Sequence, residues 1–432
     1  MRKKVNLLTM GCSKNRVDTE ILMRQLQANG FDTYYEADPA KIKFDFVAIN
    51  TCGFINDAKE ESINIILEYA ELKKKHRVGK IVVFGCLSQR YRADLQTEMP
   101  EVDAWFGKFE LKPMLDYFNA EYFCNLQPRR VVTTPPHYAY VKIAEGCNRT
   151  CSFCAIPYIT GKYQSRPIGE IIEECQQLVA SGVKEIILIA QDLSFYGVDL
   201  YKKPCLAELM EQIAKIEGLC WLRIHYTYPA HFPLDVLDVM ARHSNICNYL
   251  DIALQHISDN MLTRMRRNIS KEQTCNLVRE FRKRVPGLVL RTTLLVGHPD
   301  ETDEDFQELV DFVKDVRFDR LGVFTYSNEE NTYAFDNYTD NVPEDVKRQR
   351  MEQIMAIQQQ ISFEINQRKI GQTIKVLIDR HEGDYYIGRS EGDSPEVDGE
   401  VLVLGINLPI GNFVNVRVTD ADEFDLYAEL AE

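Results

Sequence analysis

Apolar and polar residues alternate along the first third of the chain in a pattern that predicts strands separated by helices. Short apolar runs at residues 5–10, 44–50 and 80–84 predict strands, and stretches with helical periodicity lie between them at 17–29 and 57–75. This alternation favours a parallel sheet covered by helices on both faces. The carboxyl ends of strands in such a sheet share one edge, where ligands bind.

The same alternation continues through the middle of the chain. The pattern predicts six further strands, at 138–144, 185–191, 221–228, 249–255, 288–296 and 321–326. Helical patterns fill the gaps at 168–181, 206–216, 270–284 and 303–315. Strands and helices in this order predict an open (β/α)6 relative of the TIM barrel, with its active site at the carboxyl ends of the strands.

The last part of the chain has a different pattern. A long polar helix at 343–368 is followed by short strands at 374–378, 385–389, 400–404 and 413–418, separated by turn residues. This predicts a small five-stranded barrel of the OB-like kind. The fold class is therefore α/β, with an N-terminal parallel α/β domain at 1–125, a partial TIM barrel at 133–365 and an all-β barrel at 366–432.

Three cysteines stand close together just after the first strand of the predicted partial barrel. Cys147, Cys151 and Cys154 have the spacing C-x3-C-x2-C. Three thiolates can hold three irons of a 4Fe-4S cluster and leave the fourth iron open to bind a small molecule. A structural zinc site normally needs four ligands, and no fourth Cys or His lies at ligand spacing, although zinc or a chance trio among twelve cysteines remains an alternative.

A second trio of cysteines lies in the N-terminal domain. Cys12, Cys52 and Cys86 each follow a predicted strand, so a parallel sheet would bring them to one edge, where they can hold a second cluster. The alternative is three buried structural cysteines, because free cysteine is often buried. The remaining cysteines are scattered, and we expect them to be structural: Cys124, Cys175, Cys205, Cys220, Cys247 and Cys275.

Charge and composition narrow the class of protein. The net charge is −14, which argues against a large nucleic-acid interface. From residue 366 onward there are six Lys and Arg against fourteen Asp and Glu, which suits a basic protein partner better than RNA. No apolar run approaches the roughly 20 residues that span a membrane. We therefore expect a cytoplasmic protein, in which cysteines stay reduced.

These motifs occur together in one known family. The chain resembles the radical-SAM (S-adenosylmethionine) methylthiotransferases over essentially its full length. One subgroup modifies an aspartate of ribosomal protein S-twelve, and another modifies an adenosine of tRNA beside the anticodon. The stretches that most resemble the first subgroup are residues 11–15, 50–55, 191–192 and 223–226, together with an acidic C-terminal TRAM domain.

The resemblance implies a radical mechanism with two 4Fe-4S clusters and SAM. Cys147, Cys151 and Cys154 would hold the cluster that binds and cleaves SAM, and Cys12, Cys52 and Cys86 the auxiliary cluster that presents sulfur. No catalytic residue is expected beyond these ligands. The residues that we expect to bind SAM, from their positions in the motif and near the strand ends, are Phe153, Gln191, Gln255 and Arg291.

The resemblance also implies partners. The substrate would be ribosomal protein S-twelve, free or in the small subunit, docked by the acidic TRAM domain through Glu391, Asp393, Glu396 and Asp398. An electron donor is required, no membrane is involved, and we expect a monomer. Two alternatives remain: a tRNA adenosine methylthiotransferase, and a non-catalytic iron–sulfur module that would not cleave SAM.

Overall fold

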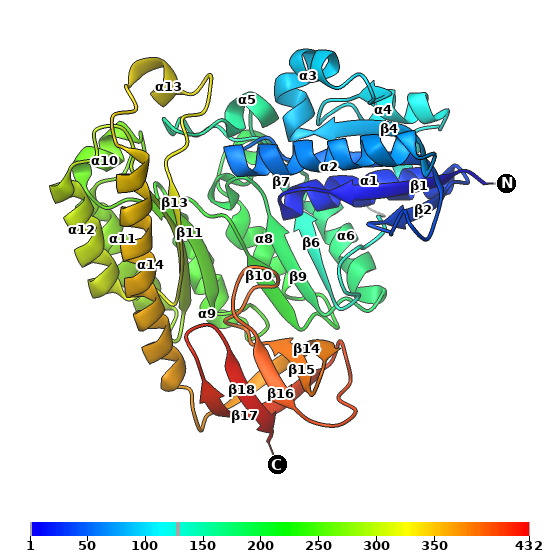
Figure 1. Cartoon of the computed structure of the whole chain (residues 1–432). Coiled ribbons are helices and arrows are strands. Elements are labelled where there is room, and N and C mark those ends of the chain that lie inside the picture. The colour runs from blue at the N-terminus through cyan, green and yellow to red at the C-terminus, as the bar shows by residue number, and fades with distance from the viewer. Residues whose placement is uncertain (1, 127–129, 432) are drawn as a thin grey trace. The chain divides into compact units, whose positions relative to one another are not determined.

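The computed structural model describes residues 2–126 and 130–431, which form two compact units. The first unit contains residues up to 133 together with 140–149 and 155–177, and the second contains 134–139, 150–154 and 178 onward. Figure 1 traces both units from the N-terminus to the C-terminus. The described residues include no helix that is both long and apolar enough to cross a membrane. The three domain boundaries predicted from the sequence stay predictions.

The first unit is built on a parallel five-stranded sheet with the order β2-β1-β3-β4-β5. The strands are β1 (Lys4–Thr9), β2 (Asp32–Tyr35), β3 (Phe44–Thr51), β4 (Val78–Gly85) and β5 (Ala104–Trp105). This confirms the predicted N-terminal parallel sheet. The pattern did not predict β2, which is only half-buried, or β5, which has two residues.

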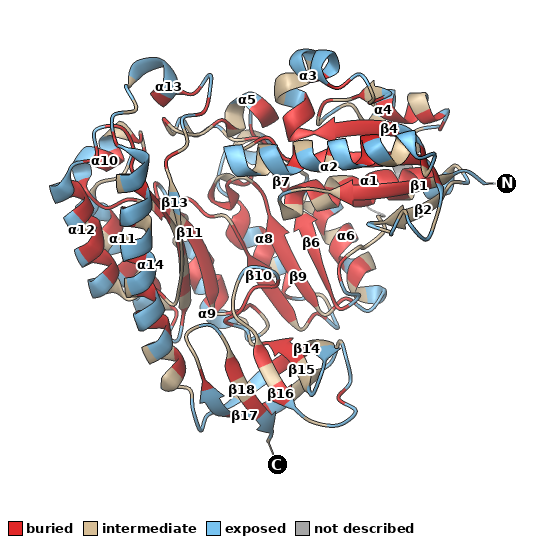
Figure 2. Cartoon of the chain, viewed as in Figure 1, coloured by how far each residue is buried: buried red, intermediate tan, exposed pale blue. Residues whose placement is uncertain are grey.

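Helices cover both faces of this sheet because the strand side chains alternate between two apolar clusters. Val47 and Ile49 of β3 pack with α2 and α3, whereas Phe46 and Ala48 pack with α1 and α4. Figure 2 shows β1, β3 and β4 as mostly buried and the outer side of α2 as exposed. The helices of this unit, including one that extends into the second, are α1 (Ser13–Ala28), α2 (Asn56–Lys74), α3 (Cys86–Glu98), α4 (Leu111–Phe118), α5 (Ile156–Thr160) and α6 (Ile168–Ala180).

The partial barrel belongs to the second unit except for most of β6, and it consists of two sheets with the orders β10-β9-β6 and β11-β12-β13. The pairs β10–β9, β11–β12 and β12–β13 are parallel. Single bridges link the region of β10 to that of β11, at Leu222–Ile246 and Thr227–Ile252. The strands are β6 (Tyr138–Lys142), β9 (Glu185–Ile189), β10 (Trp221–Ile224), β11 (Tyr249–Gln255), β12 (Val289–Val296) and β13 (Arg320–Thr325). The predicted α/β class with an open barrel is confirmed.

Capped helices follow the strands of this barrel. Ser270 and Gln273 form a capping box at the start of α11, and Thr302 and Asp305 form one at the start of α12, which satisfies the first backbone N–H groups of each helix. The longer helices are α8 (Leu206–Ile213), α9 (Asp235–Arg242), α11 (Lys271–Arg284), α12 (Asp303–Val316) and α14 (Glu344–Gln367). The shorter ones are α7 (Val198–Tyr201), α10 (Asp259–Arg264) and α13 (Tyr333–Asn337).

The chain ends in a closed five-stranded barrel with the order β14-β15-β16-β18-β17, as the sequence predicts. Its core is formed by alternate apolar residues such as Val376, Val401 and Val416. The pattern located four of its strands but not the last. The strands are β14 (Thr373–Glu382), β15 (Tyr385–Arg389), β16 (Val401–Leu404), β17 (Phe413–Ala421) and β18 (Leu426–Leu430).

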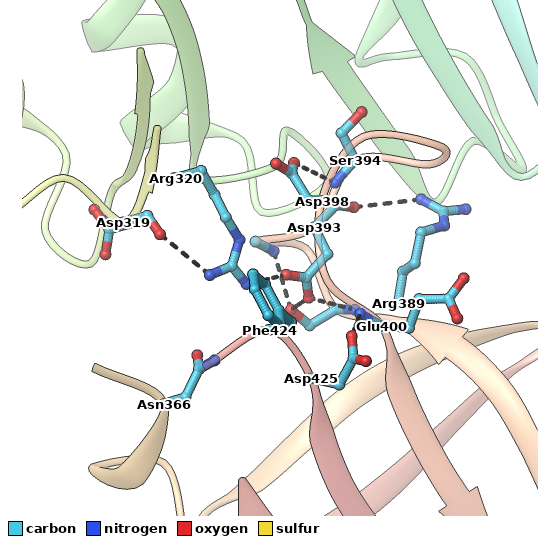
Figure 3. A network of polar contacts seen from close by, with 12 residues as sticks. Asp319, Arg320, Asn366, Arg389, Asp393, Ser394, Asp398, Glu400, Phe424 and Asp425 are labelled. Carbon is cyan, nitrogen blue, oxygen red and sulfur yellow. Dashed lines mark hydrogen bonds and ion pairs between the residues drawn. The ribbon is translucent and has the colours of Figure 1, made fainter. Parts of the chain in front are cut away.

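The small barrel packs on the amino-terminal ends of the partial-barrel strands. Tyr249 at the start of β11 donates to Asp398 at 2.7 Å, and Arg320 at the start of β13 pairs with Asp393 at 2.6 Å. Arg223 of β10 donates to the backbone oxygen of Glu391 at 2.8 Å. Figure 3 shows Arg320 beside these aspartates. The carboxyl ends of the strands, where radical chemistry is expected, lie at the other end of the sheet.

This packing corrects the expected docking carboxylates. The side chains of Asp393 and Asp398 are only 3% and 2% exposed and are paired with Arg320 and Arg291. Buried and paired aspartates cannot attract a protein partner from solution, because their charge is neutralised inside the fold. Asp393 and Asp398 therefore have a structural role, while Glu391 and Glu396 are exposed.

Candidate functional site

The parallel sheet of the first unit brings Cys12, Cys52 and Cys86 to the same edge. Cys52 directly follows β3, Cys86 is the first residue of α3 after β4, and Cys12 precedes the first residue of α1. Their three strands are neighbours in the sheet, with the order β1-β3-β4. The prediction that topology gathers these cysteines therefore agrees with the strand order, and their role as ligands remains a proposal.

Glycines let the chain segments approach closely at this edge. A Cβ atom on Gly11 would lie 2.7 Å from Cβ and 2.9 Å from Sγ of Cys52. A Cβ atom on Gly53 would lie 2.6 Å from Cα of Leu87 and 3.0 Å from the carbonyl carbon of Cys86. At each glycine the shortest of these distances is below what a real Cβ atom tolerates, so glycine is required where the cysteine loops touch.

The three thiols differ in how readily they ionise. Burial opposes ionisation of Cys12, but the charges of Lys14 and Lys108 and backbone N–H groups outweigh it, so the pKa of Cys12 lies below its ordinary value. Burial raises the pKa of Cys52, and nearby Cys12 raises it further. Burial raises the pKa of Cys86 to about 12, although the charge of Lys108 acts in the opposite direction. Lys108 thus favours the thiolate of two of these cysteines.

Lys108 belongs to a buried polar network that the sequence analysis missed. Its ammonium donates to Asn15 Oδ1 at 3.3 Å and Asp18 Oδ2 at 2.8 Å, and lies 3.8 Å from Glu145 Oε2. Asn15 Oδ1 also accepts from the thiol of Cys86 at 3.7 Å. Lys142 pairs with Asp18 and Glu145. No local pattern marks Lys108, because its partner Asp18 lies 90 residues away in sequence.

The residues at this edge fit a thiolate-held cluster. Cysteine thiolates are the ligands that iron–sulfur clusters use, and a buried cation beside them offsets their negative charge. Within residues 2–126 and 130–431, no three His, Cys, Asp or Glu side chains already stand in the arrangement of a metal site.

The second trio is divided between the units. Cys147 lies in the first unit, where its N–H donates to Gly161 O at 3.2 Å and its Sγ accepts from the N–H of Arg149 at 3.4 Å. Cys151 and Cys154 lie in the second unit, where the N–H of Cys154 donates to Cys151 O at 3.2 Å. That these three cysteines act together stays a prediction, which rests on their C-x3-C-x2-C spacing.

Arg267 is the polar partner of Cys151, and the sequence analysis also missed it. Its guanidinium donates to Cys151 Sγ at 3.2 Å and lies 4.1 Å from the centre of the Tyr228 ring. The hydroxyl of Tyr228 lies 3.6 Å from the same sulfur. Arg267 is buried, and a buried guanidinium against sulfur stabilises a thiolate.

The four predicted SAM-binding residues lie in different surroundings. Phe153 is partly buried and packs in the second unit against an apolar cluster that includes Met265 and Leu295. Gln191 directly follows the end of β9, and Gln255 ends β11 with a left-handed backbone (φ 72°). Both glutamines therefore lie at carboxyl ends of strands, where the prediction requires them.

Arg291 lies elsewhere. It is the third residue of β12 and pairs with Asp251 at 3.0 Å and with Asp398 of the small barrel at 3.4 Å. These contacts hold the guanidinium near the amino-terminal end of the strand, away from the end at Val296. Arg291 therefore has a structural role and does not lie where SAM binding is expected.

Family models match three parts of the chain. A model described as the Radical SAM superfamily matches residues 141–313. A model described as Uncharacterized protein family UPF0004 matches residues 4–107, and a TRAM domain model matches residues 370–431. The three matches fall on the first cysteine trio, the C-x3-C-x2-C motif with the partial barrel, and the small barrel.

Curated relatives match over the whole length. The protein named ribosomal protein uS12 methylthiotransferase RimO from Bacteroides fragilis is 56% identical over 431 residues, covering 99% of each chain. Proteins of the same name from Parabacteroides distasonis and Porphyromonas gingivalis are 55% and 53% identical, each covering 100% of both chains.

Solved structures share the fold at low identity. The radical S-adenosylmethionine methyltransferase TsrM from Kitasatospora setae matches with a TM-score of 0.51 and 16% identity, covering 74% of this chain and 72% of that one. The cobalamin-dependent S-adenosylmethionine radical enzyme OxsB matches with a TM-score of 0.54 and 12% identity, covering 82% of this chain and 56% of that one. At these identities the likeness concerns the fold alone.

Proposed function

Because the chain belongs to the family of ribosomal protein uS12 methylthiotransferases, we propose that it adds a methylthio group to the β-carbon of an aspartate in uS12. The observation that carries this proposal is full-length identity above 50% to proteins of that name. The same relatives favour a protein substrate over the tRNA alternative. We therefore also propose that it acts in the cytoplasm.

The proposed chemistry needs SAM and iron–sulfur clusters. When bound, SAM and its cluster supply the radical that removes hydrogen from an unactivated C–H bond, which acid–base groups cannot do. We assign Cys147, Cys151 and Cys154 to this cluster, with Arg267 supporting Cys151. We assign Cys12, Cys52 and Cys86 to the auxiliary cluster, with Asn15 and Lys108 beside it. The electron donor and the monomeric state stay predictions.

Mass spectrometry tests the substrate. Peptides of uS12 and tRNA nucleosides would be compared between cells with and without this gene. We expect a gain of one sulfur and one methylene on an aspartate-containing uS12 peptide only when the gene is present. The same gain on a tRNA adenosine, with the peptide unchanged, would support the tRNA alternative instead.

Cysteine variants test the two cluster assignments separately. Replacing Cys147, Cys151 and Cys154 with alanine should halve the bound iron and abolish SAM cleavage. Replacing Cys12, Cys52 and Cys86 should also halve the iron, but SAM cleavage should persist while methylthio transfer is lost. The control replaces Cys124, Cys220 and Cys275, which should change neither. Full iron content in the variant that lacks Cys12, Cys52 and Cys86 would refute the auxiliary cluster.

A cavity in the second unit is the surface that we propose for docking the basic substrate. It has a volume of about 560 Å³ and lies between α14, β13 and the small barrel. Phe424 and Val397 line it and are 60% and 55% exposed. Figure 3 shows Phe424 next to Arg320, and Asp425 beside Glu400. Its acidic side chains, apart from the paired Asp398, are Glu352, Glu423 and Asp425.

Apolar side chains with carboxylates around them suit a peptide that carries basic and apolar residues. Neutralising Glu352, Glu423 and Asp425 should slow uS12 modification at low salt and flatten its salt dependence. The control neutralises Asp384, Asp420 and Glu429, which are exposed on the same barrel but do not line the cavity. Equal slowing in both variants would show that only the overall charge matters.

A further inference from the structure

Lys108 is a buried cation beside the first cysteine trio. Its side chain is only 3% exposed, and three acceptors surround its ammonium: Asn15 Oδ1, Asp18 Oδ2 and Glu145 Oε2. Asn15 links it to the cysteines, because the same Oδ1 atom accepts from Cys86. The amide of Asn15 is fixed in turn, since its Nδ2 donates to Met10 O at 3.1 Å and Thr51 O at 3.3 Å. The ammonium is therefore held in a single place.

Lys142 provides a natural comparison within the same network. It pairs with the same two carboxylates, at 2.7 Å from Glu145 Oε2 and also with Asp18, and its side chain is 13% exposed. Unlike Lys108, it is not hydrogen-bonded to Asn15 in any contact among the described residues.

We propose that Lys108 is a positioning residue that raises the reduction potential of the cluster held by Cys12, Cys52 and Cys86. This inference rests on the auxiliary cluster of the proposed function. Reduction adds one electron and makes the cluster and its thiolates more anionic. A fixed positive charge in a buried site favours that more anionic state, because little water is present to screen it. Lys142 balances the carboxylates and leaves Lys108 in place.

The experiment uses the full chain with Cys147, Cys151 and Cys154 replaced by alanine, so that only the first trio can hold a cluster. The midpoint potential is measured by reductive titration followed by electron paramagnetic resonance, with iron and sulfide content as controls. Lys108→Met should shift the midpoint potential to a more negative value. Lys108→Arg keeps the positive charge, so its potential should stay close to that of the protein with Lys108. Lys142→Met, which removes the same charge from the same carboxylates, should shift it by less than half as much as Lys108→Met does.

Asp18→Asn provides a second test that does not remove the lysine. It leaves the ammonium of Lys108 less compensated, so the potential should become more positive. Equal shifts for Lys108→Met and Lys142→Met, or no shift for Lys108→Met and Asp18→Asn, would overturn the role of Lys108. Absence of any cluster when Lys108 is intact would instead overturn the proposed auxiliary cluster, so the two failures can be told apart.

Discussion

At the scale of single residues, glycine sets how closely the chain segments approach around the first cysteine trio. Gly53 lies against the backbone of Cys86 and Leu87, and even one methyl group would lie 2.6 Å from Leu87 Cα. The contact atoms are backbone, which cannot move aside as the end of a long side chain can. This residue therefore couples the position of Cys52 to that of Cys86.

We expect Gly53→Ala to destabilise the first unit by about 1–3 kcal/mol, the usual cost of overpacking. It should also reduce iron bound by the first trio while SAM cleavage persists. The control is Gly169→Ala in α6, where nothing lies within 4 Å of the added Cβ. Urea unfolding and iron content would measure both variants. An unchanged Gly53→Ala protein would show that the loops are free to move apart.

His256 contributes to the pH dependence of stability together with Glu301, whose Oε2 lies 3.9 Å from His256 Nε2 and whose pKa burial raises to about 7. His256 is fully buried, its Nδ1 accepts from the N–H of Ser258 at 3.1 Å, and burial lowers its pKa to about 3. The unfolded chain has the ordinary pKa of about 6.5 and so binds the proton more readily than the folded chain. The stability that neutral His256 contributes is therefore complete above pH 6.5 and is lost as the pH falls towards 3.

We expect His256 to make the protein about 1.4 kcal/mol less stable at pH 5.5 than at pH 7.5. Each pH unit below the unfolded-state pKa of about 6.5 lowers the free energy of unfolding by about that amount. His256→Gln cannot take up this proton, so its stability should fall less over the same range. Urea unfolding of both proteins at the two pH values would measure the difference. Parallel pH profiles would contradict the low pKa.

At the scale of elements, the strands of the partial barrel carry polar residues at their amino-terminal ends that meet the small barrel. Glu185 at the start of β9 links the partial barrel to the small barrel. It pairs with Arg223 of β10 at 2.8 Å and with Arg389 of β15 at 2.8 Å. Arg389 also pairs with Asp379 of β14 at 2.7 Å. Each of these charges has a partner from another element, so the elements are held in register by ion pairs that exclude water.

We expect Arg223→Met to destabilise the second unit by roughly 3–5 kcal/mol, the cost of breaking a buried pair. The control is Arg242→Met in α9, because Arg242 is 62% exposed and its partner Glu211 lies 3.4 Å away. Exposed pairs contribute at most about 1 kcal/mol. Chemical denaturation would compare the two. Similar losses for both variants would mean that the buried network contributes no more than a surface pair.

At the scale of the whole molecule, the small barrel and the partial barrel share one compact unit. Removing the small barrel would leave Arg223 without its contact to Glu391 and would deprive Arg291 and Arg320 of Asp398 and Asp393. A buried cation that loses its partner lowers the free energy of unfolding, because its charge stays away from water without compensation. The small barrel therefore supports the partial barrel in addition to any role in docking.

We expect a chain that ends at residue 367 to unfold at least about 10 °C below the full chain, because several kcal/mol of paired contacts are lost. Circular dichroism would follow thermal unfolding, and limited proteolysis would report which strands become accessible. In the full chain, residues 178–431 should unfold together in a single transition. A truncated chain with an unchanged midpoint would show that the two barrels are independent.

Much of the fold could be predicted because its patterns are local. The apolar run of β3 and the turn residues around β15 specify strands within a few residues, and periodicity specifies α12. The strands that escaped prediction have weak local patterns: β5 has two residues, and β2 is half-buried. Their place in the sheet is decided by neighbouring strands rather than by their own sequence.

The sequence by itself determined which side chains are available for the proposed cluster chemistry, because six cysteines at motif spacing or strand ends are soft candidate ligands wherever the chain folds. Only the tertiary structure decided their surroundings. Lys108 meets Asp18 across 90 residues and Arg267 meets Cys151 across 116, so no local pattern could reveal either contact. The predicted SAM residue Arg291 and the docking residues Asp393 and Asp398 had the right chemical type. A charge beside a buried opposite charge, however, acts within the fold and not on a ligand.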